Sequence, residues 1–342
     1  MTARRRHDYG ADAPWSVAIT IPARDEADRI VTCLDAAARS LNRHGGIVVA
    51  VNGSRDDTFA RAQAWFDATG ACGVLLDDPA PPRGGNVGHA RRQAVGACAA
   101  RLSADGAVMT TDADSRVAPD WVVANLVELR QADLICGTVL PDAGEYARLP
   151  GRIAERGAIE GEYVALTMAV QQLLDPVAHD PEPAHLNAAG ASLAFPLALY
   201  RDVGGIPDQP TAEDRAFAAR AEARGWRVRH SALARVTTSC RMDGRAPGGM
   251  AGMLSARVTE ADPLVDEALE PAEPTILRAA LRGALRRTLA DRAAFATAWA
   301  AVEEQTPALK RERMRLSEVQ RELPRLAAAL ARHAQQPERQ IA

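Results

Sequence analysis

The stretch AVMTTDAD, residues 107–114, joins five apolar or β-branched residues to two acids that flank one alanine. A short apolar run of this composition favours a buried β-strand, and the acids would follow its carboxyl end. Similar runs occur at residues 17–21, 47–51, 74–76 and 133–137. Alanine-rich helical patterns lie between them at residues 28–42, 57–69 and 87–101. This alternation predicts an α/β fold with a mostly parallel central sheet flanked by helices.

The second half of the chain becomes increasingly helical. Residues 149–174 have helical spacing, a strand is expected at 191–195, and a further helix begins near Thr211. A glycine-rich loop follows Arg241, and from Pro274 the pattern is rich in Ala, Leu and Arg. We therefore expect a flexible N-terminal tail at 1–14, one α/β domain at 15–250, and a loop with a C-terminal α-helical extension at 251–342.

The bulk composition argues against several classes of partner. The 342 residues carry a formal net charge of −3, so no basic surface predicts a nucleic-acid partner. The five cysteines are odd in number and scattered, which argues against a disulfide framework or a zinc cluster. No run approaches the roughly 18 apolar residues that a membrane-spanning helix needs. We expect a soluble protein of the reducing cytoplasm.

Polar residues follow the first four predicted strands, at 22–26, 52–54, 83–86 and 112–114. Ligands of an open parallel sheet bind beyond the carboxyl ends of the strands, so these residues form a candidate site. Two acids flanking one small residue, as Asp112 and Asp114 do, suit a hard divalent cation that also binds phosphate oxygens. The alternative is a solvated turn in which Asp114 caps a helix.

Two other groups leave a structural and a functional interpretation open. Glu213 and Asp214 follow Thr211, and acids after a threonine N-cap are common at helix starts, but Asp214 could also be a general base. Arg241 and Arg245 lie in a glycine-rich stretch, which is either a solvated linker or a loop that orders over phosphate groups.

The helical extension carries one more pattern. Ile276, Leu277, Leu281, Leu285 and Leu289 make an apolar stripe on a helix whose other faces are rich in arginine. Such stripes commonly pack on the parent domain, and we favour that interpretation. The alternative is peripheral contact with the inner face of a membrane.

Taken in order, these segments resemble family 2 glycosyltransferases with the GT-A (nucleotide-diphospho-sugar transferase) fold. The matching segments are IPARDE at 21–26, VNGSRDDT at 51–58, GNVGHAR at 85–91, TDADS at 111–115, GASLAF at 190–195, VGGIP at 203–207 and EDR at 213–215. Asp25 replaces a usual asparagine, and Asn52 replaces a usual aspartate. Thr237, Thr238 and Ser239 stand where many relatives have a histidine, so a third protein ligand for the metal is missing.

The resemblance implies a metal-dependent, inverting transfer of a sugar from a nucleoside-diphosphate sugar to an acceptor hydroxyl, by a hexosyltransferase-like enzyme. It implies that Asp214 is the catalytic base, that Glu213 lies on the acceptor side, and that Mg or Mn binds Asp114, with Asp112 on the metal or the ribose. The residues implied to bind the donor nucleotide are Pro22, Ala23, Arg24, Glu26, Asn52, Arg91, Asp112, Arg241 and Arg245.

Two other functions remain compatible with the residues. A nucleotidyltransferase of related fold would also bind a nucleotide and a metal at Asp114, although no basic glycine-rich loop follows the first strand. A non-catalytic nucleotide-sugar-binding protein is the other alternative, against which the acids at Asp112, Asp114 and Asp214 count. The acceptor is unknown.

Overall fold

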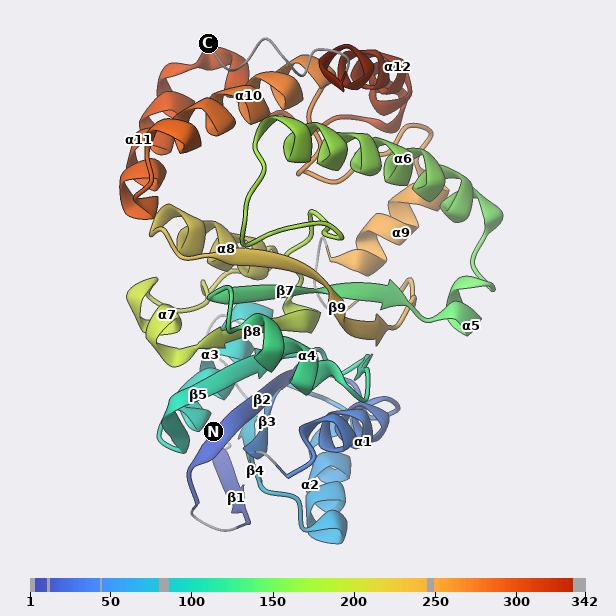
Figure 1. Ribbon diagram of the computed structural model, residues 1–342. Helices are drawn as coiled ribbons and strands as arrows, with labels where there is room; N and C mark the ends of the chain where they lie inside the picture. Colours follow the sequence, from blue (N-terminus) through green and yellow to red (C-terminus); the bar gives the residue numbers. More distant parts are fainter. Residues whose placement is uncertain (1–3, 11–12, 44, 80–85, 245–248, 335–342) are drawn as a thin grey trace. The chain divides into compact units, whose positions relative to one another are not determined.

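The computed structural model describes residues 4–10, 13–43, 45–79, 86–244 and 249–334 (Figure 1). Two compact units emerge from the distribution of contacts. The sheet unit contains Met1–Ala147, Pro183–Glu222 and Trp226–Ala251, and the helical unit contains Arg148–Glu182, Ala223–Gly225 and Gly252–Ala342.

The sheet unit is built on a nine-stranded sheet in the order β1-β4-β3-β2-β5-β8-β7-β9-β6. Its strands are β1 (Arg5–Tyr9), β2 (Trp15–Ala23), β3 (Gly45–Asn52), β4 (Gly73–Asp78), β5 (Leu102–Thr110), β6 (Ser115–Val117), β7 (Leu134–Pro141), β8 (Leu193–Pro196) and β9 (Val228–Thr238). Strands β4, β3, β2 and β5 are parallel neighbours, as are β7 and β9, whereas β1, β8 and β6 pair antiparallel. The predicted α/β fold is confirmed.

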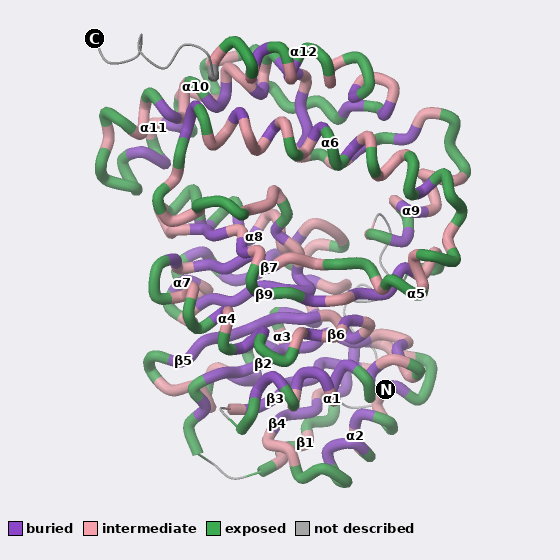
Figure 2. The backbone as a smooth tube through the Cα atoms, turned by 45° about the vertical axis from the view of Figure 1, so that its right-hand side comes forward, coloured by how far each residue is buried: buried purple, intermediate pink, exposed green. Residues whose placement is uncertain are grey.

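Helices cover both faces of this sheet because side chains alternate along each strand. Val17, Ile19 and Ile21 of β2 share one apolar cluster with α1 (Ile30–Leu41), α2 (Thr58–Thr69) and α4 (Trp121–Glu128). Ala18 lies in the cluster of the other face, with α3 (Val87–Cys98), α7 (Leu197–Asp202) and α8 (Glu213–Ala223). The central strands are accordingly buried on both sides (Figure 2).

The register of the strands brings the predicted site residues to one edge. Ala23 is opposite Val51 in the β2–β3 pair, and Asn52 is opposite Asp78 in the β3–β4 pair. The backbone N–H of Thr111 donates to Thr20, so β5 ends beside β2. The carboxyl ends of β2, β3 and β5 therefore carry their polar residues along the same edge, as expected.

The prediction of a flexible tail is wrong for Arg5–Tyr9. These residues form β1, which pairs antiparallel with β4. The Arg5 guanidinium pairs with Asp77 at 2.5 Å, and the Tyr9 ring stacks on Phe66 with centroids 4.6 Å apart. An edge strand that is mostly exposed has no apolar alternation, so its polar sequence did not indicate it.

The helical unit contains α6 (Gly151–Leu174), α10 (Ala272–Thr288), α11 (Arg292–Gln305), α12 (Leu316–Ala334) and most of α9 (Met250–Thr259). The predicted C-terminal helical extension is thus present. The boundary between 15–250 and 251–342 needs correction, because α6 packs against α10 and α12 and belongs with them. Helix α9 also occupies part of a stretch predicted to be a loop.

The apolar stripe of α10 is covered within the helical unit. Leu277, Leu281, Leu285 and Leu289 pack against Phe295, Trp299 and Leu309. The arginines of α10 are also engaged: Arg278 Nε donates to Glu270 at 2.7 Å, and Arg286 Nε donates to Asp175 at 2.7 Å. The stripe therefore packs on residues of the C-terminal extension itself, and not on the parent domain as expected. Within the described ranges, no helix is long and apolar enough to cross a bilayer.

Candidate active site

Asp112 and Asp114 lie in the tight connection between β5 and β6. The backbone N–H of Ser115 donates to the Asp112 carbonyl at 3.0 Å, and the N–H of Ser239 donates to the Asp114 carbonyl at 3.3 Å. Ala113, between the acids, is buried in the apolar core, and this burial anchors the turn. The two side chains are partly accessible, with exposed fractions of 34% for Asp112 and 18% for Asp114.

Asp114 has a shifted pKa. Burial, followed by the charge of Asp112, raises the pKa of Asp114 to about 6. Arg241 opposes this shift, because its Nη2 lies 3.2 Å from Asp114 Oδ2. The same guanidinium makes two hydrogen bonds to Glu26. Arg241 is thus shared between two carboxylates. It therefore does not neutralise all of the negative charge of the pair Asp112 and Asp114.

The carboxylates of Asp112 and Asp114 fit a hard divalent cation. Hard cations such as Mg²⁺ are commonly held by one or two carboxylates together with substrate phosphates. Burial and the neighbouring charge of Asp112, which together raise the pKa of Asp114, both disfavour its ionised form, and a bound cation would offset this. Among the described residues, no cluster of three or more His, Cys, Asp and Glu side chains is suited to a metal. Thr238 Oγ1 donates to Asp114 Oδ1 at 3.4 Å.

Arg91 of α3 connects several parts of the site. Its Nη2 donates to Asp112 Oδ1 at 2.5 Å, its Nε donates to Glu213 Oε1 at 2.9 Å, and its Nη1 donates to the Gly190 carbonyl at 2.8 Å. Burial disfavours the charged guanidinium, but the nearby carboxylates outweigh it and raise the pKa of Arg91. The side chain is only 3% exposed, which leaves little surface for direct contact with a donor.

Glu213 and Asp214 begin α8 but have different surroundings. Glu213 is buried against Arg91, and burial raises its pKa although Arg91 opposes the shift. Asp214 is only partly buried, and its Oδ2 accepts the Gly190 N–H at 2.6 Å. The first backbone hydrogen bond of α8 goes to Ala212, not to Thr211, and Ala212 has a left-handed φ of 57°. Asp214 is therefore the more accessible acid.

Asn52 lies at the end of β3 in a buried polar setting. Its Nδ2 donates to the Asn86 carbonyl at 3.1 Å, which fixes the orientation of the amide. Its Oδ1 is buried and has no hydrogen-bond partner in the described structure. Asn86 in turn caps α3 by accepting the N–H of His89 and donates to Asp208 at 2.7 Å. Asn52 thus offers an acceptor that an external N–H group could satisfy.

The remaining predicted donor residues fall into two groups. Pro22 and Ala23 end β2, and Arg24 follows them. The Glu26 carboxylate accepts from Arg241, and its backbone N–H donates to Thr58 Oγ1 at 2.8 Å. Arg245 and residues 83–85 of the glycine-rich loop lie outside the described residues.

Sequence reasoning missed the residues that anchor the exit of β9. Arg29 Nη1 donates to Glu145 Oε1 at 2.8 Å, and Glu145 Oε2 accepts the Ser239 hydroxyl at 2.9 Å and the Cys240 N–H at 2.7 Å. These contacts position the segment that carries Arg241. Gly190 was part of a recognised motif without an assigned role, but nothing in the sequence around Arg29 or Glu145 indicated this contact.

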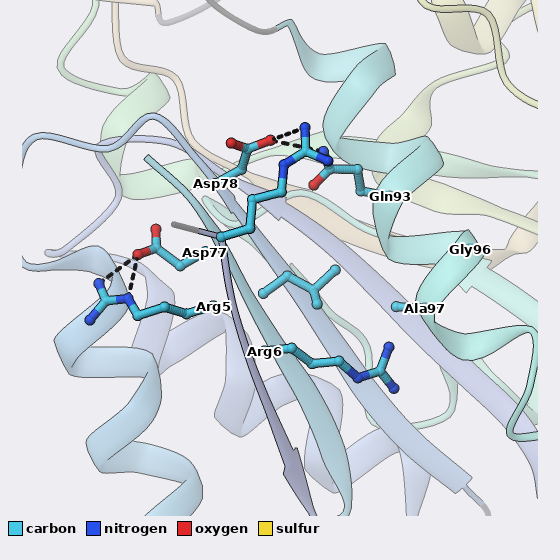
Figure 3. Close-up of a pocket in the computed structure, with 9 residues that line it drawn as sticks. Arg5, Arg6, Asp77, Asp78, Gln93, Gly96 and Ala97 are labelled. Atoms are coloured by element: carbon cyan, nitrogen blue, oxygen red, sulfur yellow. Dashed lines mark hydrogen bonds and ion pairs between the residues drawn. The ribbon is translucent and has the colours of Figure 1, made fainter. Parts of the chain in front are cut away.

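A separate pocket of about 310 Å³ lies between the N-terminal arginines, the end of β4 and α3 (Figure 3). Its lining comes from the N-terminal arginines, the end of β4 and α3: Arg4, Arg5, Arg6, Leu76, Asp77, Asp78, Gln93, Gly96 and Ala97. Its charges pair with each other or nearby: Arg4 with Asp78 at 2.8 Å, Arg5 with Asp77, and Arg6 with Asp8. It contains none of the predicted site residues, so we centre the candidate site on the acids.

Comparison with known proteins gives likenesses in structure only. No protein-family model matches the chain, and no curated protein matches it. The mannosyltransferase PcManGT from Pyrobaculum calidifontis, solved with GDP-Man and Mn²⁺, is 16% identical with a TM-score of 0.47, over 95% of this chain and 88% of that one. S. aureus TarS 1–349 with UDP-GlcNAc is 15% identical with a TM-score of 0.49, over 78% and 72%.

A third similar structure is glucosyl-3-phosphoglycerate synthase from Mycobacterium tuberculosis, in complex with Mn²⁺, UDP and phosphoglyceric acid. It is 19% identical with a TM-score of 0.44, over 71% of this chain and 77% of that one. At such values, none of these likenesses assigns a substrate to this chain.

Proposed function

We propose that this protein is a metal-dependent, inverting glycosyltransferase that moves a sugar from a nucleoside-diphosphate sugar to an acceptor hydroxyl. The observation that carries the proposal is the arrangement at one sheet edge. Two neighbouring acids whose charge is only partly compensated, Asp112 and Asp114, lie at this edge. Asp112 belongs to the same hydrogen-bonded network as the more accessible Asp214. A phosphate-binding cation and a general base are the two devices that such a transfer needs.

Asp214 serves as the base in this proposal. The acceptor O–H proton passes to the Asp214 carboxylate while the acceptor oxygen forms a bond to the anomeric carbon. The bond from that carbon to the β-phosphate oxygen breaks, and the nucleoside diphosphate leaves with the electron pair. Attack from the face opposite the leaving group inverts the anomeric configuration.

Asp114 and Asp112 would hold Mg or Mn, which would neutralise charge that develops on the departing diphosphate. Arg241 is 20% exposed and lies beside Asp114, so its guanidinium is in place to bind phosphate oxygens. Glu26 would then be released from its pairing with Arg241. Arg245 stays a prediction from the sequence alone.

Asn52 faces the nucleobase in this proposal, with Pro22, Ala23 and Arg24 beside it. One N–H of Nδ2 is used on Asn86, and the buried atom of Asn52 that has no partner among the described residues is its Oδ1 acceptor. Such an acceptor suits uracil or guanine, which carry a ring N–H, better than adenine or cytosine, which present a ring nitrogen acceptor there.

A thermal-shift panel tests the proposal: UDP, GDP, ADP and CDP, each with and without Mn²⁺. Binding to the folded state raises the melting temperature by mass action. We expect UDP or GDP to give the largest rise, and the Mn²⁺-dependent part to vanish in Asp114→Asn. No rise with any nucleotide would refute the donor site.

The product distinguishes the alternatives. Incubation of the responsive sugar nucleotide should release nucleoside diphosphate, and the anomer formed is read by NMR. Release of pyrophosphate from a nucleoside triphosphate and a sugar phosphate would indicate a nucleotidyltransferase instead. The donors to test include UDP-GlcNAc and GDP-mannose, each with a panel of simple sugar acceptors. Binding without turnover of any of them would favour a non-catalytic binding protein.

A further inference from the structure

The Arg91 side chain and the backbone of Gly190 together connect Asp112 to Asp214. The guanidinium donates to Asp112 through Nη2 and to the Gly190 carbonyl through Nη1, and the Gly190 N–H donates to Asp214 Oδ2 at 2.6 Å. We propose that Arg91 is a positioning residue which, through the Gly190 backbone, sets the catalytic base Asp214 relative to the metal-side acid Asp112. This inference rests on the proposed glycosyl transfer.

Arg91 is held too firmly to act as a mobile donor contact. Its guanidinium makes ion pairs with Asp112 and Glu213 from two different elements, the end of β5 and the start of α8. Glu213 is itself only 4% exposed. A buried charge with hydrogen-bonded partners on both sides contributes less to net stability than to a single defined geometry. The arrangement therefore fixes the start of α8, and with it Asp214, against the acid turn.

Gly190 is the residue that permits this contact. A Cβ atom built on Gly190 would lie 2.3 Å from Arg91 Nη2 and 2.4 Å from Arg91 Cζ, inside any allowed separation. The guanidinium thus lies directly against the peptide. The Gly190 carbonyl also accepts the Thr110 hydroxyl at 2.5 Å, so two donors from α3 and β5 hold the peptide after the Gly190 Cα. The N–H of the peptide before that Cα donates to Asp214, so the two contacts are linked through the backbone of this one residue.

Three substitutions disturb this connection in different ways. Arg91→Lys keeps the charge but removes the planar fork, Gly190→Ala displaces the guanidinium, and Thr110→Val removes one donor to the Gly190 carbonyl with little change of shape. The first two have matched controls outside the site. Arg92→Lys changes the next residue, which donates to the Ile206 carbonyl, and Gly96→Ala adds a Cβ on α3 that meets no atom within 4 Å.

The first measurement is steady-state turnover of the sugar nucleotide that the wild type accepts, with Mn²⁺. Misplacing a catalytic group by about 1 Å costs on the order of 10²-fold, so we expect kcat to fall by about 10- to 100-fold in Arg91→Lys and Gly190→Ala. Thr110→Val should lose about threefold, because one donor to the carbonyl remains. The controls should keep wild-type kcat, and KM for the donor should change less than kcat in all variants.

A double-mutant cycle separates positioning from a general structural role. If Gly190→Ala and Thr110→Val act on turnover through Asp214, neither should lower the residual rate of Asp214→Asn by more than about twofold. If the fold-losses in turnover of the single variants multiply in the double variants, the inference is overturned. Wild-type kcat in soluble, folded Arg91→Lys and Gly190→Ala would also overturn it. Thr110→Val provides the same cycle where the other two variants fail to fold.

The two proposals fail in distinguishable ways. A wild type that binds no nucleoside diphosphate and turns over no sugar nucleotide refutes the proposed function. An active wild type whose Gly190→Ala and Thr110→Val variants are as active as it is refutes only the role of Arg91.

Discussion

Glu213 and Asp214 begin the same helix, yet the chain uses their carboxylates differently. Glu213 forms a buried pair with Arg91, whereas Asp214 accepts the backbone N–H groups of Gly190 and Arg215 and remains partly accessible. Adjacent acids at a helix start are commonly interchangeable, because both complement the helix dipole. Here the burial of one distinguishes the structural acid from the acid available for chemistry.

Replacing the available acid should remove the base and little else. We expect Asp214→Asn to lower kcat by about 10²-fold or more, because the amide cannot take a proton at neutral pH. Binding of UDP or GDP with Mn²⁺, measured by calorimetry, should stay close to wild type. Asp208→Asn, at a nearby acid that is 55% exposed, is the control. Wild-type-like turnover in Asp214→Asn would assign the base elsewhere.

The raised pKa of Asp114 gives a pH-dependent stability in metal-free protein. The ordinary pKa of this carboxyl is 3.8, and the folded state raises it to about 6. Between these values the folded chain binds more protons than the unfolded chain, so stability falls as pH rises through that window, and the cost is complete above it.

Asp114→Asn removes this cost. In EDTA, we expect the variant to melt at a higher temperature than the wild type at pH about 7.5, with the difference shrinking toward pH about 4. Arg241 keeps Glu26 as its partner in the variant. Calorimetric melting curves across this pH range provide the measurement. A lower melting temperature at the higher pH, or a gap that does not change with pH, would contradict the assignment.

At the scale of elements, apolar periodicity predicted the central strands and their helices. Residues 47–51 and 107–111 carry apolar runs because both faces of the sheet are covered, and such runs are visible without an alignment. Strand β1 was not predicted, because Arg5–Tyr9 is held through pairing with β4 and not through an apolar face. The grouping of α6 with the later helices depends on packing between distant segments, which no local pattern records.

The candidate site was predictable to the same extent. Asn52, Asp112 and Asp114 directly follow strands, so the edge they share follows from the fold. The contact between Arg91 and Gly190 joins residues 99 positions apart through a backbone carbonyl, and a carbonyl has no sequence signature. The sequence also did not predict that Glu213 is buried and Asp214 accessible, because this difference depends on which carboxylate faces the buried Arg91 guanidinium.

Strand β1 should contribute measurably to stability. Tyr9 stacks on Phe66 of α2, so Tyr9→Ala should lower the free energy of unfolding by about 1–3 kcal/mol through lost aromatic burial. Arg6→Ala, at an exposed position that pairs only within the strand, should change it by less than about 0.5 kcal/mol. Guanidinium chloride titrations of both variants measure the difference. Equal effects would mean that β1 is not held through Tyr9.

At the scale of the whole molecule, the arginine-rich helices raise the question of a membrane surface. We expect the full chain to stay in the supernatant with phosphatidylglycerol vesicles, because the α10 leucines are covered and its arginines Arg278 and Arg286 bind acids. Phosphatidylcholine vesicles are the control in the co-sedimentation. Pelleting with the anionic vesicles that salt reverses would restore the membrane interpretation.

Arg241 gives the proposed enzyme a form of coincidence detection. While its guanidinium rests against Asp114 and Glu26, a divalent ion approaching alone meets a site already partly compensated by a cation. A nucleoside diphosphate that arrives with the ion provides an anion to which Arg241 can bind in place of the carboxylates. The ion and the donor should therefore bind together. Free Mn²⁺ should leave the protein largely without metal when no donor is present.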